Sequence, residues 1–203
     1  MFVQINRNTL NKEIIRKAVD ILIGDGVLIA PTETAYGFVC DAANKEAIDK
    51  IYKIKKREKN KFLPLAVASL AQMQDYFELN KKELDLSKKH PGLSLVVRPR
   101  VREQVNNVFL FKDQKDCAVR ISTNNLIQSI ARKLGRPLTV SSANLAGEDV
   151  CYSVPEIKKQ IGDLESKVDM ILDNGRLKVK KPSTIVRVCG DGVEILRQGE
   201  IEI

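Results

Sequence analysis

The sequence predicts an α/β protein with a large, mixed, twisted sheet flanked by helices. Segments with the helical spacing of apolar residues alternate with short, continuous apolar runs, which are typical of buried strands. The alternation is irregular, and the chain ends in two strand-like segments around a tight turn, so a purely parallel sheet is not expected. No internal repeat or low-complexity linker interrupts the 203 residues. We therefore expect one domain over residues 1–203.

In the first half of the chain, helix caps and stops mark most of the expected elements. Gly24 ends the first helix, Asn44 caps the second, and Ser69 with Gln72 forms a capping-box pattern for the third. The expected elements are, in order, a helix with its apolar face at Leu10, Ile14, Ile15, Ala18, Val19 and Leu22, a strand over Val27–Ala30, a helix carrying Ile48, Ile51 and Tyr52 that ends near Lys55, a strand over Leu63–Ala68, a short helix through Phe77, and one helical turn opened by Asn80 and Glu83.

In the second half, glycines and turn residues separate the elements. The segment between residues 97 and 118 shows no clear pattern. The expected elements are strands over Leu93–Val97 and Ala118–Ile121, a helix over Leu126–Leu134 ended by Gly135, a strand over Leu138–Ser141, a helix opened by the capping-box pattern of Ser153 and Glu156, a strand over Val168–Leu172, and a hairpin of Thr184–Val188 with Val193–Leu196 across Gly190-Asp191-Gly192.

Composition and charge favour some functions and argue against others. The formal net charge of +8 favours anionic partners such as nucleotides, phosphates or RNA, although it also suits solubility alone. The cysteines form no Cys-x-x-Cys pair and sit in or beside apolar runs, so we expect small buried thiols and no zinc site. The only histidine, His90, is expected in a loop. The cysteines are Cys40, Cys117, Cys151 and Cys189.

Several common signatures are absent from the sequence. No glycine-rich dinucleotide motif or phosphate-binding loop follows a strand, so a nucleotide would have to bind in another way. The N-terminus has no apolar signal-peptide core, and no window reaches membrane-spanning length. We therefore expect a soluble, cytoplasmic protein without a membrane partner.

Three short polar segments follow strands or a helix and carry the candidate chemistry. They are Pro31-Thr32-Glu33-Thr34-Ala35-Tyr36-Gly37, the basic run that starts at Lys55-Lys56-Arg57, and Ser142-Ala143-Asn144. Hydroxyls and cations at strand ends suit an anionic substrate. Taken singly, each has a structural explanation: a local turn, a solvated helix end and a helix cap. Arg120, Arg197 and Ser183 also have such explanations, as edge charges and a strand start.

Together and in this order, the segments resemble the YrdC/Sua5/TsaC family of threonylcarbamoyl-AMP synthases. The resemblance runs from about Asp25 to Gly199, and the chain is most similar in its organisation to the short, single-domain members of the family. Phe62 stands where the family usually has proline, and Lys56 and Glu58 replace the common glycine and proline around the arginine. The matching motifs also include Lys61-Phe62-Leu63-Pro64-Leu65, Pro91-Gly92, Ala118-Val119-Arg120-Ile121, Gly147, Pro182-Ser183-Thr184-Ile185-Val186 and Leu196-Arg197-x-Gly199.

The resemblance implies an enzyme that condenses L-threonine, bicarbonate or CO2, and ATP into threonylcarbamoyl-AMP with release of pyrophosphate. Mg²⁺ is implied as the companion of ATP. The product would serve N6-threonylcarbamoyladenosine formation at position 37 of tRNAs. A downstream tRNA threonylcarbamoyl transferase complex, and tRNA or double-stranded RNA itself, are the implied macromolecular partners. No covalent nucleophile is needed for this nucleotidyl transfer.

The resemblance also implies roles for nine residues. Lys55 and Arg57 would contact the triphosphate, and Lys59 would also lie on the nucleotide side. Asn144 and Arg197 are implied nucleotide contacts, whereas Thr32, Ser142 and Ser183 are implied contacts of threonine or its carbamate. Arg120 would pair with the threonine carboxylate. Lys55, Arg57, Ser142 and Asn144 form the implied catalytic set.

Two other functions fit parts of the sequence. A binding protein for double-stranded RNA or the ribosome would explain the net charge and the lysine run, but not Ser142-x-Asn144, Arg120 and Ser183, because backbone phosphates need mainly dispersed cations. A carbamoyl-transfer domain as in HypF proteins would share the Lys-x-Arg and Ser-x-Asn motifs, but it normally belongs to a much longer chain. We rank the synthase first and the RNA-binding protein second.

Overall fold

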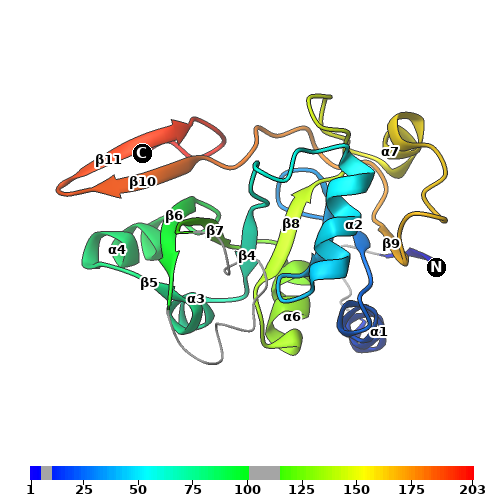
Figure 1. The fold of residues 1–203 in the computed structure, drawn as a ribbon, viewed down its shortest axis with the longest axis horizontal. Coiled ribbons are helices and arrows are strands. Elements are labelled where there is room, and N and C mark those ends of the chain that lie inside the picture. Colours follow the sequence, from blue (N-terminus) through cyan, green and yellow to red (C-terminus); the bar gives the residue numbers. More distant parts are fainter. Residues whose placement is uncertain (6–10, 101–114) are drawn as a thin grey trace.

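A mixed sheet dominates the computed structural model, which describes residues 1–5, 11–100 and 115–203 (Figure 1). The spatial order of its strands is β1-β9-β2-β3-β8-β4-β7-β6-β10-β11, with β5 paired to β6. The sheet contains parallel pairs such as β4 with β7 and antiparallel pairs such as β3 with β8, which confirms the mixed sheet. The strands are β1 (Phe2–Gln4), β2 (Leu28–Pro31), β3 (Tyr36–Asp41), β4 (Leu65–Val67), β5 (Phe77–Glu78), β6 (Ser94–Pro99), β7 (Cys117–Ile121), β8 (Leu138–Ser142), β9 (Met170–Asp173), β10 (Ile185–Cys189) and β11 (Gly192–Arg197).

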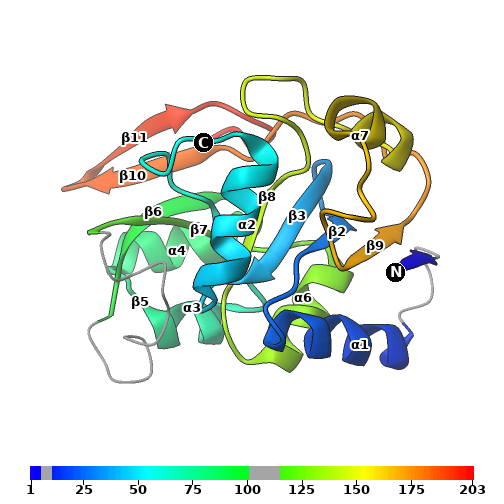
Figure 2. The same cartoon turned by 45° about the vertical axis from the view of Figure 1, so that its right-hand side comes forward.

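Helices flank the sheet, and side chains cap several of them as the sequence predicts. The Asn44 side chain accepts a hydrogen bond from the Ala47 amide, and Ser69 accepts one from Gln72. Helices α1 and α6 pack against each other, while α2 packs on β3 (Figure 2). The helices are α1 (Lys12–Ile23), α2 (Lys45–Lys55), α3 (Leu70–Tyr76), α4 (Lys81–Lys89), α6 (Asn125–Leu134) and α7 (Val154–Ile161).

Strand β3 lies in the middle of the sheet and was not predicted. All six of its residues are buried, with β2 on one side and β8 on the other. Its apolar stretch is short and begins next to Gly37, a residue that weakens any strand prediction. The sequence therefore indicates only the turn before it. A fully buried strand needs neighbours on both sides, and those come from distant parts of the chain.

Four further expectations need correction or lie outside the described residues. Helix α4 is nine residues long rather than one turn, because the capping box of Asn80 and Glu83 starts a helix that continues to Lys89. Ser153 makes no capping hydrogen bond, and the Glu156 carboxylate accepts from the backbone amide of Tyr152 rather than from that of Ser153. Cys189 is exposed near the tip of the terminal hairpin, although it was expected to be buried. Leu10 lies outside the described residues.

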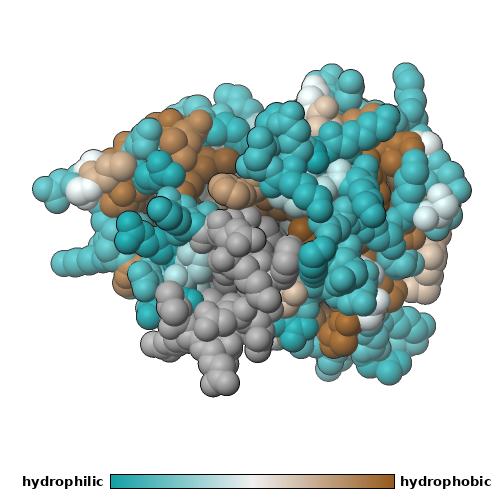
Figure 3. Space-filling view, in the orientation of Figure 1, coloured by the Kyte–Doolittle hydropathy of each residue, from teal (hydrophilic) through white to brown (hydrophobic). Residues whose placement is uncertain are grey.

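The β10–β11 hairpin extends away from the body of the domain (Figure 1). Apolar side chains gather on the surface around it (Figure 3), and Ile195 and Leu196 on β11 are each 46% exposed. Among the described residues, every helix is too short or too polar to span a lipid bilayer. Although β10 and β11 lie at one end of the sheet, Ser183 and Arg197 at the base of the hairpin line the cavity described below.

Candidate functional site

Six of the nine predicted site residues line one small cavity, which we call the arginine pocket. Its volume is about 150 Å³. It lies where the turn between β2 and β3, the end of α2, the end of β8 and the base of the hairpin meet. The predicted residues in its wall are Thr32, Arg57, Arg120, Ser142, Ser183 and Arg197. The sequence motifs are therefore brought together in space, as the family resemblance implies.

Close backbone packing brings the β2–β3 turn against the end of β8. Gly37 pairs with Ser142 across the antiparallel ladder. A Cβ atom at Gly37 would lie 3.1 Å from the Thr32 methyl group and 3.2 Å from the Ser141 carbonyl oxygen. A side chain at Gly37 would thus require the turn or β8 to shift by a few tenths of an ångström.

The Thr32 hydroxyl is used to build the turn. It donates to the Ala35 carbonyl at 2.7 Å and accepts from the Thr34 amide at 3.2 Å. Its one proton is therefore already used. Thr32 therefore stabilises a local turn, which was one of the two interpretations of this segment from the sequence. Thr32 also lines the arginine pocket.

Arg57 leaves the end of α2 through a left-handed turn. Lys56, the C-cap of α2, has φ +48° and ψ +41°, a conformation that glycine adopts at the least cost. This explains why glycine is common there in the family that the sequence resembles. The Arg57 guanidinium then donates to the carbonyl oxygens of Lys61 and Phe62, each at 3.0 Å. Both bonds hold it without neutralising its charge.

Arg120 is paired with Glu33, which sequence reasoning did not select. The Arg120 Nε donates to Glu33 Oε1, and the Ser122 hydroxyl donates to Glu33 Oε2 at 3.0 Å. The two side chains of the ion pair are only 6% and 11% exposed. Burial raises the pKa of Glu33, but the Arg120 charge and these hydrogen bonds outweigh it and hold that pKa below its usual range. Glu33 could have been selected from the sequence, because it lies inside the first motif, Pro31-Thr32-Glu33-Thr34-Ala35-Tyr36-Gly37.

Arg197 reaches the pocket because the chain after β11 crosses the segment before β10 at very close range. A Cβ atom at Gly199 would lie 2.1 Å from the Pro182 carbonyl oxygen, so this position requires glycine. The Arg197 Nη2 donates to the Ser183 carbonyl at 2.7 Å and to the Ser183 hydroxyl at 3.0 Å. Burial, followed by the charge of Arg120, lowers the pKa of Arg197.

The arginine pocket carries excess positive charge. Three guanidinium groups line it, and Glu33 neutralises one of them. Neither Arg57 nor Arg197 forms an ion pair with a carboxylate in the part of the chain that the structure describes. Guanidinium stays charged at all ordinary pH values. The pocket is therefore suited to one or two small anions.

Lys55 lies behind the pocket and holds the Ser142–Asn144 segment. It is 2% exposed, and its ammonium donates to the Ser142 carbonyl, the Asn144 carbonyl at 2.8 Å and the Asn144 Oδ1 at 3.1 Å. Burial and the neighbouring Arg57 charge lower the pKa of Lys55 to about 7. Three acceptors require three protons, which only the ammonium form supplies.

Asn144 is also committed to this loop. Its Oδ1 accepts from the Ser142 hydroxyl at 2.6 Å, and its Nδ2 donates to the Glu148 carbonyl at 2.6 Å. A nucleotide contact by the Asn144 amide would therefore have to replace the bond to Glu148. Ser142 keeps free lone pairs that can accept a hydrogen bond from a ligand.

Lys59 is the predicted residue that the structure places away from the pocket. Its side chain is 67% exposed and pairs with Asp49 at 2.6 Å. Its place in the basic run after α2 matches the solvated helix end that the sequence also allowed.

Fold and site together define an α/β protein with a positively charged, arginine-lined pocket at the ends of its central strands. The chain belongs to the Sua5/YciO/YrdC family, whose model, described as "Telomere recombination", matches residues 20–199.

Relatives and solved structures agree with this assignment. A Methanocaldococcus jannaschii protein named as a candidate threonylcarbamoyl-AMP synthase is 31% identical over 206 residues, which cover 96% of this chain and 91% of that protein. The structure of E. coli YciO has a TM-score of 0.82 at 25% identity and covers 98% of this chain and 95% of that one. P. abyssi Sua5 complexed with L-threonine has a TM-score of 0.83 at 22% identity, which shows the same fold. This chain spans 57% of that longer Sua5 chain.

Proposed function

We propose that this protein is an L-threonylcarbamoyladenylate synthase. The observation that carries the proposal is the meeting of Arg57, Arg120 and Arg197, from three distant parts of the chain, around one small polar pocket. Membership of the family and the name of the M. jannaschii relative support it. So does the L-threonine complex of P. abyssi Sua5.

In the proposed reaction, the amine of L-threonine first reacts with bicarbonate to give a carbamate and water. A carbamate oxygen then forms a bond to the α-phosphorus of ATP. The bond from that phosphorus to the bridging oxygen breaks, and the electron pair leaves with pyrophosphate. Both reactants are anions, so alignment and charge screening supply most of the catalysis.

The arginines would divide this work between them. Arg120 uses its Nε for Glu33, which leaves its terminal nitrogens for the threonine carboxylate. Arg57 would bind the phosphates. Its guanidinium donates to two uncharged backbone carbonyls, so it keeps its full positive charge and the planar shape that suits a two-point contact with phosphate. Arg197 would contact the nucleotide, and its bond to Ser183 would orient the Ser183 hydroxyl toward the threonine side.

The Ser142–Asn144 segment would contribute position and one acceptor. Ser142 donates its proton to Asn144, so its oxygen would accept from the threonine amine or hydroxyl. Lys55, through its three bonds to the segment, would position Ser142 and Asn144. Mg²⁺ would arrive as Mg-ATP, because the described residues hold no cluster of acidic or metal-binding side chains able to keep it by themselves.

The proposal is tested by incubating the purified protein with Mg-ATP and bicarbonate, with L-threonine present, omitted or replaced by L-serine. We expect threonine-dependent pyrophosphate release and a threonylcarbamoyl-AMP product by mass spectrometry. Folded protein that releases no pyrophosphate under these conditions would refute the synthase. Binding of double-stranded RNA by that inactive protein would favour the RNA-binding alternative, which the net charge of +8 also suits. Delivery of the product to tRNA modification is part of the same proposal.

A further inference from the structure

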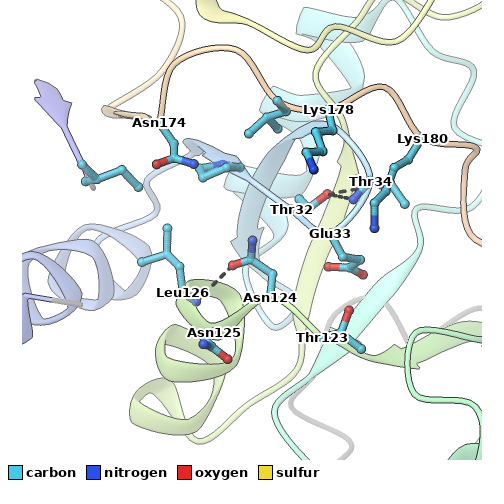
Figure 4. A pocket seen from close by; sticks show the side chains of 13 residues that line it. Thr32, Glu33, Thr34, Thr123, Asn124, Asn125, Leu126, Asn174, Lys178 and Lys180 are labelled. Carbon is cyan, nitrogen blue, oxygen red and sulfur yellow. Dashed lines mark hydrogen bonds between the residues drawn. The ribbon is translucent and has the colours of Figure 1, made fainter. Parts of the chain in front are cut away.

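A second, larger cavity adjoins the arginine pocket and is not used by any of the predicted site residues except Thr32. We call it the loop cavity (Figure 4). Its volume is about 490 Å³, and it shares Thr32 and Thr34 with the arginine pocket. The remaining lining residues are Ile5, Pro31, Glu33, Thr123, Asn124, Asn125, Leu126, Asn174, Leu177, Lys178 and Lys180.

Two lysines on the loop between β9 and β10 point into this cavity. Figure 4 shows the side chains of Lys178 and Lys180 directed toward the Thr32–Thr34 turn. Lys178, Val179 and Lys180 are all exposed, Val179 at 71%, so the two lysines line the cavity while they remain in contact with solvent. Hydrogen bonds with Tyr152 anchor the loop, at the Leu177 amide (2.8 Å) and the Lys180 carbonyl (2.9 Å).

The loop cavity is positively charged. The Lys178 and Lys180 ammonium groups make no ion pair or hydrogen bond with any residue that the structure describes. Among the residues that the structure describes, Glu33 is the only acidic side chain in the wall, and Arg120 already balances its charge. Amides of Asn124 and Asn125 and hydroxyls of Thr34 and Thr123 add uncharged donors. This set suits a compact, highly charged anion.

The size of the arginine pocket favours an adjoining phosphate subsite if the proposed function holds. Pockets that enclose a ligand of nucleotide size usually measure about 300–1,000 Å³, whereas the arginine pocket measures about 150 Å³. It is smaller than the space that usually encloses ligands as large as an amino acid and a nucleoside triphosphate together. An in-line displacement also sends the leaving group away from the attacking carbamate. The leaving group therefore needs cations beyond the reacting phosphorus.

We propose that the loop cavity is a subsite for a pyrophosphate-class anion, held by Lys178 and Lys180. The inference rests on the proposed function and deepens it. The anion would be the β- and γ-phosphoryl groups of bound ATP, and then the pyrophosphate that they become. Lysine is a common phosphate ligand that acts as a point charge. The Thr32–Thr34 turn would stand between this subsite and the place of the amino acid.

The test measures binding of Mg-pyrophosphate and of AMP by isothermal titration calorimetry, without turnover. The ligands are titrated into the wild type, the Lys178→Gln/Lys180→Gln double variant and the control Lys181→Gln. Lys181 lies on the same loop and is exposed, and its side chain does not line the cavity. We expect the double variant to bind pyrophosphate at least about tenfold more weakly, as loss of two charged contacts implies. AMP binding and the control should stay within about twofold.

Three outcomes would overturn the inference. Equal pyrophosphate affinity in all three proteins, or no pyrophosphate binding by the wild type, excludes the subsite. An equal loss for AMP and pyrophosphate indicates a general charge effect. Competition with ATP separates the two sources: ATP that displaces pyrophosphate in the wild type shares the subsite through its own phosphates. If pyrophosphate binding depends on the lysines but threonine-dependent turnover is absent, the subsite stands and the proposed function fails.

Discussion

The arginine pocket and the loop cavity share the Thr32–Thr34 turn, and both carry excess positive charge, but they hold that charge differently. In the arginine pocket, Arg57 and Arg197 are held by backbone carbonyls, and Arg120 is held by a buried carboxylate. In the loop cavity, two lysines reach inward on flexible stems without partners among the described residues. Fixed guanidinium groups suit the alignment of reacting atoms, whereas mobile ammonium groups suit the capture and release of an anion.

The largest effect should come from breaking the ion pair that fixes the arginine pocket. Arg120→Met leaves the Glu33 carboxylate buried without its cation, so we expect the free energy of unfolding to fall by about 3–5 kcal/mol. Urea unfolding at pH 7 measures this loss. The double variant Glu33→Gln/Arg120→Met should recover part of it, because the stranded charge is then removed. Equal stability of the single and double variants would show that Glu33 does not depend on Arg120.

The next effect tests whether Arg57 contacts the phosphates at two points through its planar guanidinium group or acts only as a point charge. Arg57→Ala should lower kcat/KM for threonine-dependent pyrophosphate release by about 100-fold or more, and Arg57→Lys should recover little of it. Arg132→Ala, on the exposed side of α6, is the matched control and should keep wild-type activity. An Arg57→Lys enzyme with near-wild-type turnover would refute the forked contact.

A smaller effect tests the buried lysine behind the pocket. Because the folded-state pKa of Lys55 is lowered to about 7, burial of its charge opposes folding fully below pH 7. That penalty is lost as the pH rises toward the unfolded pKa near 10.4. Relative to Lys55→Met, the wild type should therefore gain about 1 kcal/mol of unfolding free energy per pH unit above 7.

Urea unfolding of both proteins between pH 7 and 9 measures this difference for Lys55. A difference that does not change with pH would mean that the three carbonyl acceptors keep the ammonium fully protonated. In that case Lys55 would keep its positive charge at these pH values, as Arg57 and Arg197 do, despite its burial.

The smallest effect concerns Lys59, which the sequence placed on the nucleotide side and the structure places outside both cavities. Lys59→Gln should change kcat/KM by less than about twofold, since its charge is exposed and already paired with Asp49. A tenfold loss, with unchanged thermal stability, would mean that Lys59 reaches the nucleotide in the bound state.

Much of the fold was accessible from the sequence because it depends on local patterns. Caps such as Asn44 and Ser69, and the alternation in the terminal hairpin, involve residues a few positions apart. Local patterns did not predict β3, because its own strand pattern is weak and its pairing with β2 and β8 stabilises it as a buried strand. They also failed at Ser153, where Glu156 bonds to a different backbone group.

The sequence by itself determined which residue types would meet in the site, because its motifs and their order identify the family. Only the tertiary structure decided how those residues are engaged. The partner of Arg120 is Glu33, 87 residues away, and Lys55 bonds to a loop that is equally distant. Such partners follow from strand register and from close crossings at Gly37 and Gly199. Register is set by the packing of the whole sheet, and no short stretch of sequence contains it.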